Sequence, residues 1–177
     1  LEYSDNHEGF VDLVCGEMIP AIASENLAKY CDVFCEDGYF TVNQSRRILE
    51  TAKEFGIAPR LHADEFKDSG AAELAAEIGA VSADHLMAAS EKGIKAMILS
   101  GVIATILPGT TLFLGMNKYV DGRKLIDSGC DVSLATDFNP GSCTIQSMPL
   151  IISLAVLYCG MTIEEAFKAA TYTGAKS

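Results

Sequence analysis

Residues 57–85 decide the fold, and they read IAPRLHADEFKDSGAAELAAEIGAVSADH. The apolar run Ala58 to His62 predicts a strand. The segment that Ser69 opens and Gly79 closes has apolar residues at helical spacing, and glycine is the usual residue just past a helix end. A second apolar run, Ala80 to Ala83, predicts the next strand. Strand, helix and strand in this order form a βαβ unit, which favours parallel pairing.

The same alternation continues in both directions from this unit. The four clearest strands start near residues 58, 80, 102 and 132, so each interval holds one strand and one helix. Serial units of this size predict an α/β fold, either a (β/α)8 barrel or a doubly wound sheet. A complete barrel needs about 250 residues, so the roughly five strands of this chain predict only part of one. The strands are expected at residues 31–35, 58–62, 80–83, 102–107 and 132–136, and the helices at 11–22 with Pro20 as a limit, 41–56, 69–78, 90–100, 117–128, 147–158 and 162–171.

Composition narrows the class of protein. With 49% hydrophobic residues in 177, the chain is expected to fold as one domain. Its 24 acidic and 13 basic residues, a formal net charge of -11, disfavour nucleic acid and anionic membranes as partners. The apolar runs are far shorter than the roughly 18 residues that a membrane span needs. The six cysteines lie mostly in apolar runs without a CxxC pair, which favours reduced thiols in a cytoplasmic protein.

Polar residues stand where three of the predicted strands end. His62 follows the first strand of the opening stretch, Asp84 and His85 follow the second, and Asp137 follows the run at 132–136. The carboxyl ends of parallel strands meet on one edge of a sheet, where functional groups of such folds gather. Each residue alone has a simpler interpretation, for example a core histidine or a turn aspartate. Together, imidazole and carboxylate groups predict a shared site for zinc or a similar metal.

Other kinds of site are less well supported by the sequence. The glycine-rich phosphate-binding patterns GxGxxG and GxxxxGK[ST] are absent, and so is the GxSxG pattern of serine hydrolases. Cys143 follows the Asp137 loop, but no acid–base partner marks it as a nucleophile. The chain begins with Leu1 and stops just after a helical pattern, so we expect it to be a piece of something longer.

Five motifs along nearly the whole chain resemble those of the imidazolonepropionase family, within the metal-dependent amidohydrolase superfamily. They are LHADEF at 61–66, GAAELAAE at 70–77, SADHL at 82–86, LPGT at 107–110 and LATDFNPGS at 134–142. The resemblance implies a TIM-like (β/α)8 barrel. It also implies hydrolysis of 4-imidazolone-5-propanoate to N-formimidoyl-L-glutamate, a step of histidine degradation, with a small-molecule substrate, and it is compatible with a homodimer.

The resemblance also implies roles for individual residues. One metal ion, zinc or iron, is held by an HxH pair together with a later His and an Asp, which His62 and Asp137 match. Glu65 and His85 match catalytic positions, and Glu65 also contacts the substrate. The remaining substrate-contacting positions are Asn139, Gly141 and Ser142.

One departure from the family pattern bears on activity. The chain has three histidines and no HxH pair. We therefore expect residues 1–177 to be a partial barrel domain, without the first barrel strands and without the flanking β-sandwich domain. Since half of the metal ligands are missing from it, this chain by itself is expected to be inactive.

The implied chemistry is hydrolysis by metal-activated water. Asp137 would take a proton from the water as general base, Glu65 would return one to the leaving nitrogen, and His85 would polarise the developing oxyanion or orient the water. Two alternatives remain open. One is a related amidohydrolase that acts on another cyclic amide, an amidine or a nucleobase, and the other is a non-catalytic barrel fragment.

Overall fold

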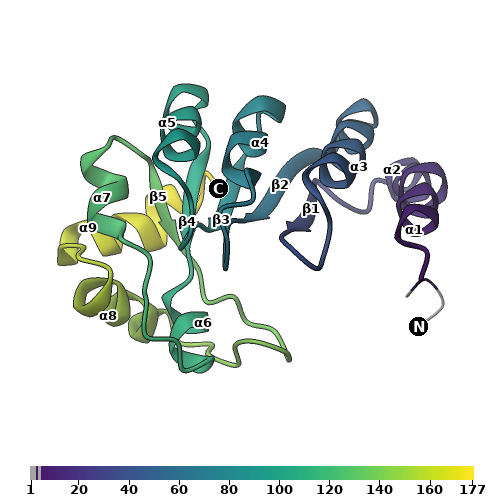
Figure 1. Cartoon of the computed structure of the whole chain (residues 1–177). Helices are drawn as coiled ribbons and strands as arrows, with labels where there is room; N and C mark the ends of the chain where they lie inside the picture. The colour runs from purple at the N-terminus through teal and green to yellow at the C-terminus, as the bar shows by residue number, and fades with distance from the viewer. Residues whose placement is uncertain (1–2, 4) are drawn as a thin grey trace.

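Five strands form a single parallel sheet in the computed structural model, which describes Tyr3 and residues 5–177. Each strand pairs with the one that precedes it in the chain, so the spatial order is the sequence order (Figure 1). A doubly wound sheet reverses its strand order at a switch point, and this sheet does not. The arrangement is that of consecutive units of a (β/α)8 barrel, and the predicted fold class is confirmed. The strands are β1 (Tyr30–Cys35), β2 (Ala58–Ala63), β3 (Ser82–His85), β4 (Ile103–Ile106) and β5 (Val132–Leu134).

Helices follow the strands in turn. Figure 1 shows α3, α4 and α5 side by side along one face of the sheet, with α8 and α9 beyond β5. The described helices include none that is both long and apolar enough to cross a membrane. The helices are α1 (His7–Leu13), the π-helical η1 (Val14–Met18), α2 (Ile19–Ser24), α3 (Val42–Glu54), α4 (Ala71–Ile78), α5 (Glu91–Ser100), α6 (Pro108–Phe113), α7 (Gly122–Asp127), α8 (Met148–Tyr158), α9 (Ile163–Lys168) and the π-helical η2 (Ala169–Thr173).

The expected limit of the first helix at Pro20 is wrong. Helical structure continues through α2 because the wider turn of η1 comes just before the proline, where the Ile19 N–H bonds to the Val14 carbonyl five residues back. Pro20 then lies in the first turn of α2, where its missing N–H has little effect.

The segment after β4 also differs from its prediction. The expected helix at 117–128 is shorter, because Asp121 caps it and α7 starts at Gly122. A further helix, α6, begins at Pro108 directly after β4, and the apolar pattern at 102–107 contains no sign of it. Proline in the first helical turn is the one local signal for α6. This helix carries Thr110, which matters for the site.

Two sets of side chains alternate along the strands. Leu61, Ala83 and Ala104 are completely buried and pair in register across β2, β3 and β4. The next row along the strands is largely polar and faces the opposite side, since successive residues of a strand point to opposite faces of the sheet. That row consists of Phe34, His62, Asp84, Thr105 and Ser133. The sheet therefore has an apolar row beside a largely polar row, and His62 of the candidate site belongs to the polar row.

Candidate metal and catalytic site

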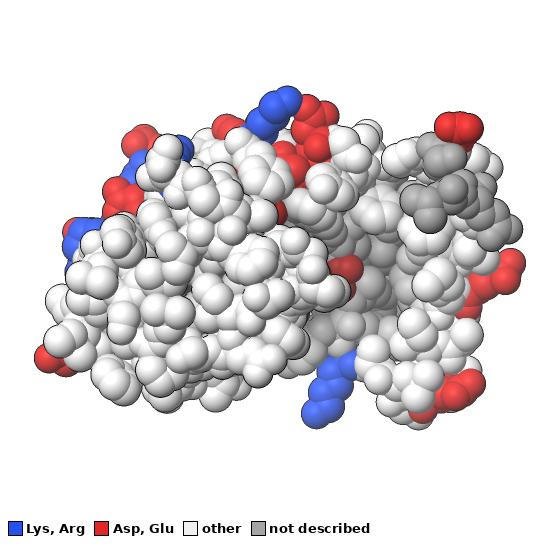
Figure 2. Space-filling view, turned by 90° about the horizontal axis from the view of Figure 1, so that it is seen from below, with Lys and Arg blue, Asp and Glu red and all other residues white. Residues whose placement is uncertain are grey.

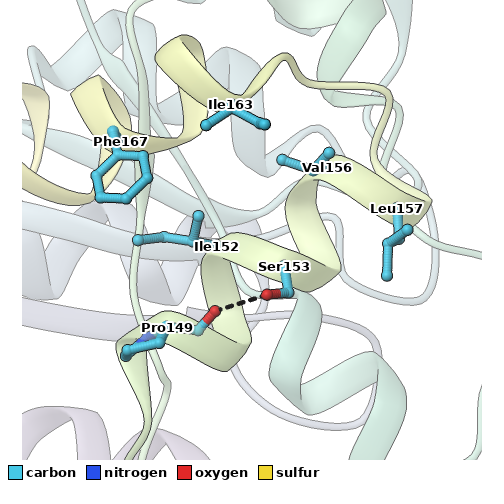
Figure 3. Close-up of a pocket in the computed structure, with 7 residues that line it drawn as sticks. All are labelled: Pro149, Ile152, Ser153, Val156, Leu157, Ile163 and Phe167. Carbon is cyan, nitrogen blue, oxygen red and sulfur yellow. Dashed lines mark hydrogen bonds between the residues drawn. The ribbon is translucent and has the colours of Figure 1, made fainter.

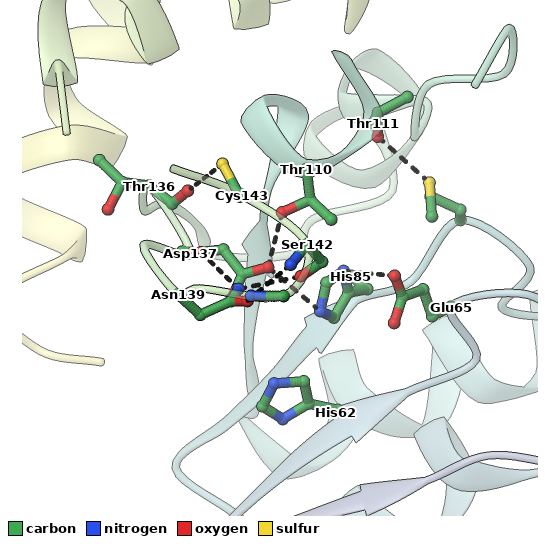
Figure 4. A network of polar contacts seen from close by, with 12 residues as sticks. His62, Glu65, His85, Thr110, Thr111, Thr136, Asp137, Asn139, Ser142 and Cys143 are labelled. Atoms are coloured by element: carbon green, nitrogen blue, oxygen red, sulfur yellow. Dashed lines mark hydrogen bonds and ion pairs between the residues drawn. The ribbon is translucent and has the colours of Figure 1, made fainter. Parts of the chain in front are cut away.

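The structure brings three predicted residues together at the carboxyl edge of the sheet. One ligand atom each from His62, His85 and Asp137 lies within 4.8 Å of the other two. Figure 4 shows these side chains converging from β2, β3 and the loop after β5. Glu65 joins them, because its Oε1 lies 3.6 Å from Nδ1 of His85, while Nε2 of His85 lies 4.0 Å from Oδ2 of Asp137. The structure thus brings these predicted residues together, and their roles stay predictions.

The LHADEF segment turns sharply where β2 ends. Asp64 is completely buried and has a left-handed backbone, with φ of 49°. Its carboxylate accepts hydrogen bonds from the backbone N–H groups of Ser69, Ala71 and Ala72 and from the Ser69 hydroxyl. The expectation that Ser69 opens α4 is therefore corrected, since Asp64 satisfies the first N–H groups of this helix. This anchored turn places Glu65 next to His85.

The loop after β5 is held by its own side chains and by α6. The Thr110 hydroxyl donates a hydrogen bond of 2.6 Å to Oδ2 of Asp137. Asn139 donates to the Asp137 carbonyl and to the Ser142 hydroxyl, and its Oδ1 accepts from the backbone N–H groups of Gly141 and Ser142. The amide of Asn139 thus organises the loop, and its contact with substrate stays a prediction.

Burial sets the charge states of two side chains in the site. Glu65 is 5% exposed, and burial raises its pKa to about 7, with His62 opposing the shift and Asp137 adding to it. His85 is 4% exposed, and burial together with the neighbouring His62 lowers its pKa to about 4. A neutral imidazole and a carboxyl group that holds its proton near neutral pH therefore stand side by side.

The pKa of His62 shifts in the opposite direction from that of His85. Burial by itself lowers the pKa of His62, but the Asp32 carboxylate outweighs this effect and raises the pKa to about 9. Oδ2 of Asp32 lies 2.6 Å from Nδ1 of His62. The ring N–H is poorly aligned with this oxygen, so the contact is an ion pair and not an aligned hydrogen bond.

Sequence reasoning did not identify Asp32 or Thr110 as site residues, and it did not assign a role to Asp84. Asp32 stands at a polar position within the alternating run 31–35, which was a weak signal that it faces the same side as the site. Thr110 stands in the LPGT motif just beyond a strand end. Asp84 lies in register with His62, burial and the nearby Asp32 raise its pKa to about 6, and its Oδ1 has no hydrogen-bond partner.

The residues present fit a metal ion. Two imidazoles and one carboxylate within 4.8 Å form a donor set that suits zinc or iron. A second acidic group, formed by Asp64, Asp68 and Glu73, is also close enough to hold an ion. There the buried Asp64 carboxylate already accepts the first N–H groups of α4, so this group serves the helix end.

Recesses of different character lie on the surface. Figure 2 shows the molecule hollowed between the part that contains α8 and the part that contains α1, with acidic side chains visible at the edge of the hollow. Figure 3 shows an apolar groove of about 530 Å³ on α8 and α9, where the Ser153 hydroxyl donates to the Pro149 carbonyl. The groove offers no acid–base or metal-binding group. Its lining residues are Pro149, Ile152, Ser153, Val156, Leu157, Ile163 and Phe167.

Comparison with known sequences places this chain beside one kind of enzyme. It is 52% identical over 174 residues to an imidazolonepropionase of Alkaliphilus oremlandii and 50% identical over 175 residues to one of Alkaliphilus metalliredigens. These matches cover 98% and 99% of this chain but 41% and 42% of the relatives, so the chain spans about two fifths of their length. No family profile matches the chain. The resemblance to imidazolonepropionase is confirmed along nearly the whole chain.

Solved structures confirm the fold. A 5-methylcytosine deaminase from Klebsiella pneumoniae superposes with a TM-score of 0.73 at 19% identity, covering 92% of this chain and 47% of that one. An uncharacterized metal-dependent hydrolase from Pyrococcus furiosus superposes with a TM-score of 0.67 at 16% identity, covering 90% and 44%. At these identities the likeness shows the barrel architecture alone. The chain has the fold of consecutive units of a (β/α)8 barrel.

Proposed function

We propose that this chain is the later part of an imidazolonepropionase, an enzyme that hydrolyses 4-imidazolone-5-propanoate to N-formimidoyl-L-glutamate. The observation that carries the proposal is the convergence of His62, His85, Asp137 and Glu65 at one edge of the sheet. The identity of about 50% to enzymes of that name supports the choice of substrate.

His62 and Asp137 hold a zinc or iron ion in the complete protein. When bound, the metal supplies Lewis acidity that lowers the pKa of a coordinated water towards neutrality. The other metal ligands come from outside these residues, as does the flanking β-sandwich domain. His7, the third histidine of the chain, lies at the start of α1, far along the fold from the strand ends (Figure 1). The 177-residue chain alone therefore lacks a full ligand set and does not turn over substrate.

Three side chains handle protons and charge during hydrolysis. Asp137 takes a proton from the attacking water, with its carboxylate oriented by the Thr110 hydroxyl. Glu65 is buried and favours its protonated form, so it donates a proton to the ring nitrogen that leaves. His85 lies between these two carboxyl groups and polarises the oxygen on which negative charge develops.

The loop after β5 and the net charge of the chain both bear on substrate binding. Asn139 holds Gly141 and Ser142 in place by accepting from both of their N–H groups, so the loop presents a fixed edge to the imidazolone ring. The propanoate arm is anionic, whereas this chain carries a net charge of -11. The cationic group that binds the arm is therefore supplied from outside the chain.

The proposal is tested with Asp137→Asn in the full-length protein that contains these residues. We expect the variant to lose bound metal and to lower turnover of imidazolone propanoate by roughly a thousandfold, because one substitution removes both a ligand and the base. Metal content by atomic absorption and steady-state rates give the two readouts. The matched control is Asp131→Asn, an exposed aspartate at the opposite end of β5. Near-normal turnover of Asp137→Asn, or a wild type that hydrolyses a nucleobase instead, would contradict the proposal.

A further inference from the structure

β1 carries none of the predicted site residues, yet Asp32 in β1 and Glu36 just after it contact β2 and the segment that follows β2. Glu36 accepts the backbone N–H groups of Asp37 and Phe66 and so acts on the chain itself. Asp32 reaches a side chain, because its Oδ2 lies 2.6 Å from Nδ1 of His62. We propose that Asp32 is a positioning residue for His62, which it orients for metal binding. This inference rests on the proposed metal-binding role of His62.

The nitrogen that Asp32 contacts decides what His62 can do. With Nδ1 facing the carboxylate, Nε2 is the nitrogen left to bind a metal. Histidines that ligate metals commonly donate the other ring N–H to a carboxylate, which selects the tautomer and makes the ligating nitrogen more basic. The ring is also confined on its faces, since its centroid lies 5.5 Å from that of Phe34 and 5.2 Å from that of His85. Asp32 adds an electrostatic contact at Nδ1, which ring packing lacks.

The choice of partner argues that the contact is more than a surface ion pair. Asp32 lies directly opposite Arg60 in the β1–β2 register, so Arg60 is its expected cross-strand partner. Instead, the Arg60 guanidinium lies over the Tyr30 ring, 4.1 Å from its centroid. Among the ion pairs of the described residues, Asp32 pairs with His62 alone, which lies two residues beyond Arg60 on β2.

The other carboxylate near His62 is less suited to this role. Asp84 lies in register with His62 on β3, but its Oδ1 is buried without a hydrogen-bond partner and no contact joins it to the imidazole. The side chain of Asp32 is 38% exposed and that of His62 is 29% exposed. Asp32 is therefore close to solvent, and its variants are suitable for measurement.

The test measures zinc affinity in the full-length protein by competition with a chromophoric chelator. We expect Asp32→Asn to weaken zinc binding about 10- to 100-fold and Asp32→Glu to recover part of the loss. The matched control is Asp37→Asn, which removes one negative charge from an exposed residue just beyond the end of β1 and should change zinc affinity less than twofold. The visible spectrum of the cobalt-loaded protein is expected to change in Asp32→Asn and to stay the same in Asp37→Asn.

A double-mutant cycle separates positioning from a general structural effect. If Asp32 acts through His62, Asp32→Asn has little further effect on zinc affinity once His62→Gln is present. An equal loss in both backgrounds, or unchanged affinity in the single variant, would overturn the inference. Failure of the proposed function has a different signature, because wild type would then bind zinc no more tightly than His62→Gln does.

Discussion

The two edges of the sheet differ in which residues adopt left-handed backbone. Where helices return to the sheet, after α3, α4, α5 and α7, the residue with positive φ is glycine: Gly56, Gly79, Gly101 and Gly129. Glycine adopts this conformation without a steric penalty. At each of these four positions an added Cβ would meet no atom within 4 Å, so conformation alone calls for glycine there.

At the other edge, where strands end, glycines such as Gly38 and Gly70 are joined by four left-handed residues that bear side chains. They are Asp64 after β2, His85 and Leu86 at the end of β3, and Asp137 after β5, with φ between 49° and 74°. Asn26, in the turn after α2, is the remaining non-glycine residue of this kind in the described part of the chain. Left-handed backbone costs such residues about 1–2 kcal/mol each. The comparison shows that left-handed residues at the first edge carry no steric strain. At the second edge, backbone strain accompanies the side chains of the candidate site.

Among the following variants, the largest expected effect on turnover comes from the contact between Thr110 and Asp137 at the strand-end edge. In Thr110→Val the hydroxyl that orients Asp137 is replaced by a methyl group of similar size, and we expect turnover of the full-length protein to fall about 10- to 100-fold. The control is Thr111→Val, a neighbouring buried threonine whose hydroxyl contacts the Met87 sulfur instead. Equal losses in the two variants would mean that α6 packing, rather than the contact with Asp137, supports activity.

A variant of Glu65 shows whether the candidate site lowers the free energy of unfolding. Its pKa is raised in the folded protein from an ordinary value of 4.5 to about 7, so folding disfavours the ionised form. Below pH 4.5 both states are protonated and nothing is lost, whereas the penalty grows as pH rises to 7 and is complete above it. We therefore expect Glu65→Gln to increase the free energy of unfolding of the metal-free protein by about 2 kcal/mol at pH 8.

Urea unfolding at pH 5 and pH 8 measures this difference. The control is Glu164→Gln, an exposed glutamate in the first turn of α9, for which we expect a much smaller dependence on pH. The same stability gain at both pH values would show that the ionised carboxylate is not what folding disfavours. A fall in turnover is expected alongside the gain in stability, because the proton donor is lost.

The glycine edge gives the smallest expected effect. Gly79→Ala places a side chain on left-handed backbone and should lower the free energy of unfolding by about 1 kcal/mol without changing turnover, since the site is at the opposite edge. Gly16→Ala is the control, because Gly16 lies within η1 with open space around it. Alanine there is expected to be neutral or stabilising. A loss of turnover in Gly79→Ala would contradict the view that the glycine edge affects stability and not activity.

Much of the fold could be predicted because its signals are local. The capping boxes Thr41–Gln44 and Thr162–Glu165 and the Ser90 cap are all present as expected. Apolar periodicity located all five strands within about two residues. The prediction failed at Pro20, where an unforeseen π-helical turn accommodates the proline.

The candidate site was predictable to a different extent. Strand ends and family motifs indicated His62, Glu65, His85 and Asp137, and the structure brings these four together. The residues that hold these four side chains in place were not predicted. Ser69 stood at the right distance to cap α4, but the more distant Asp64 does so, because a buried carboxylate needs several donors and the helix end supplies them.

The sequence by itself determined the order and type of the elements, because glycines, caps and apolar spacing act within a few residues. It also determined which side chains stand at strand ends. Only the tertiary structure decided that β1 supplies Asp32 to His62 and that α6 supplies Thr110 to Asp137. Those contacts join residues roughly 30 positions apart, and they depend on strand register and helix placement. Long-range pairing of this kind leaves no periodic trace in the chain.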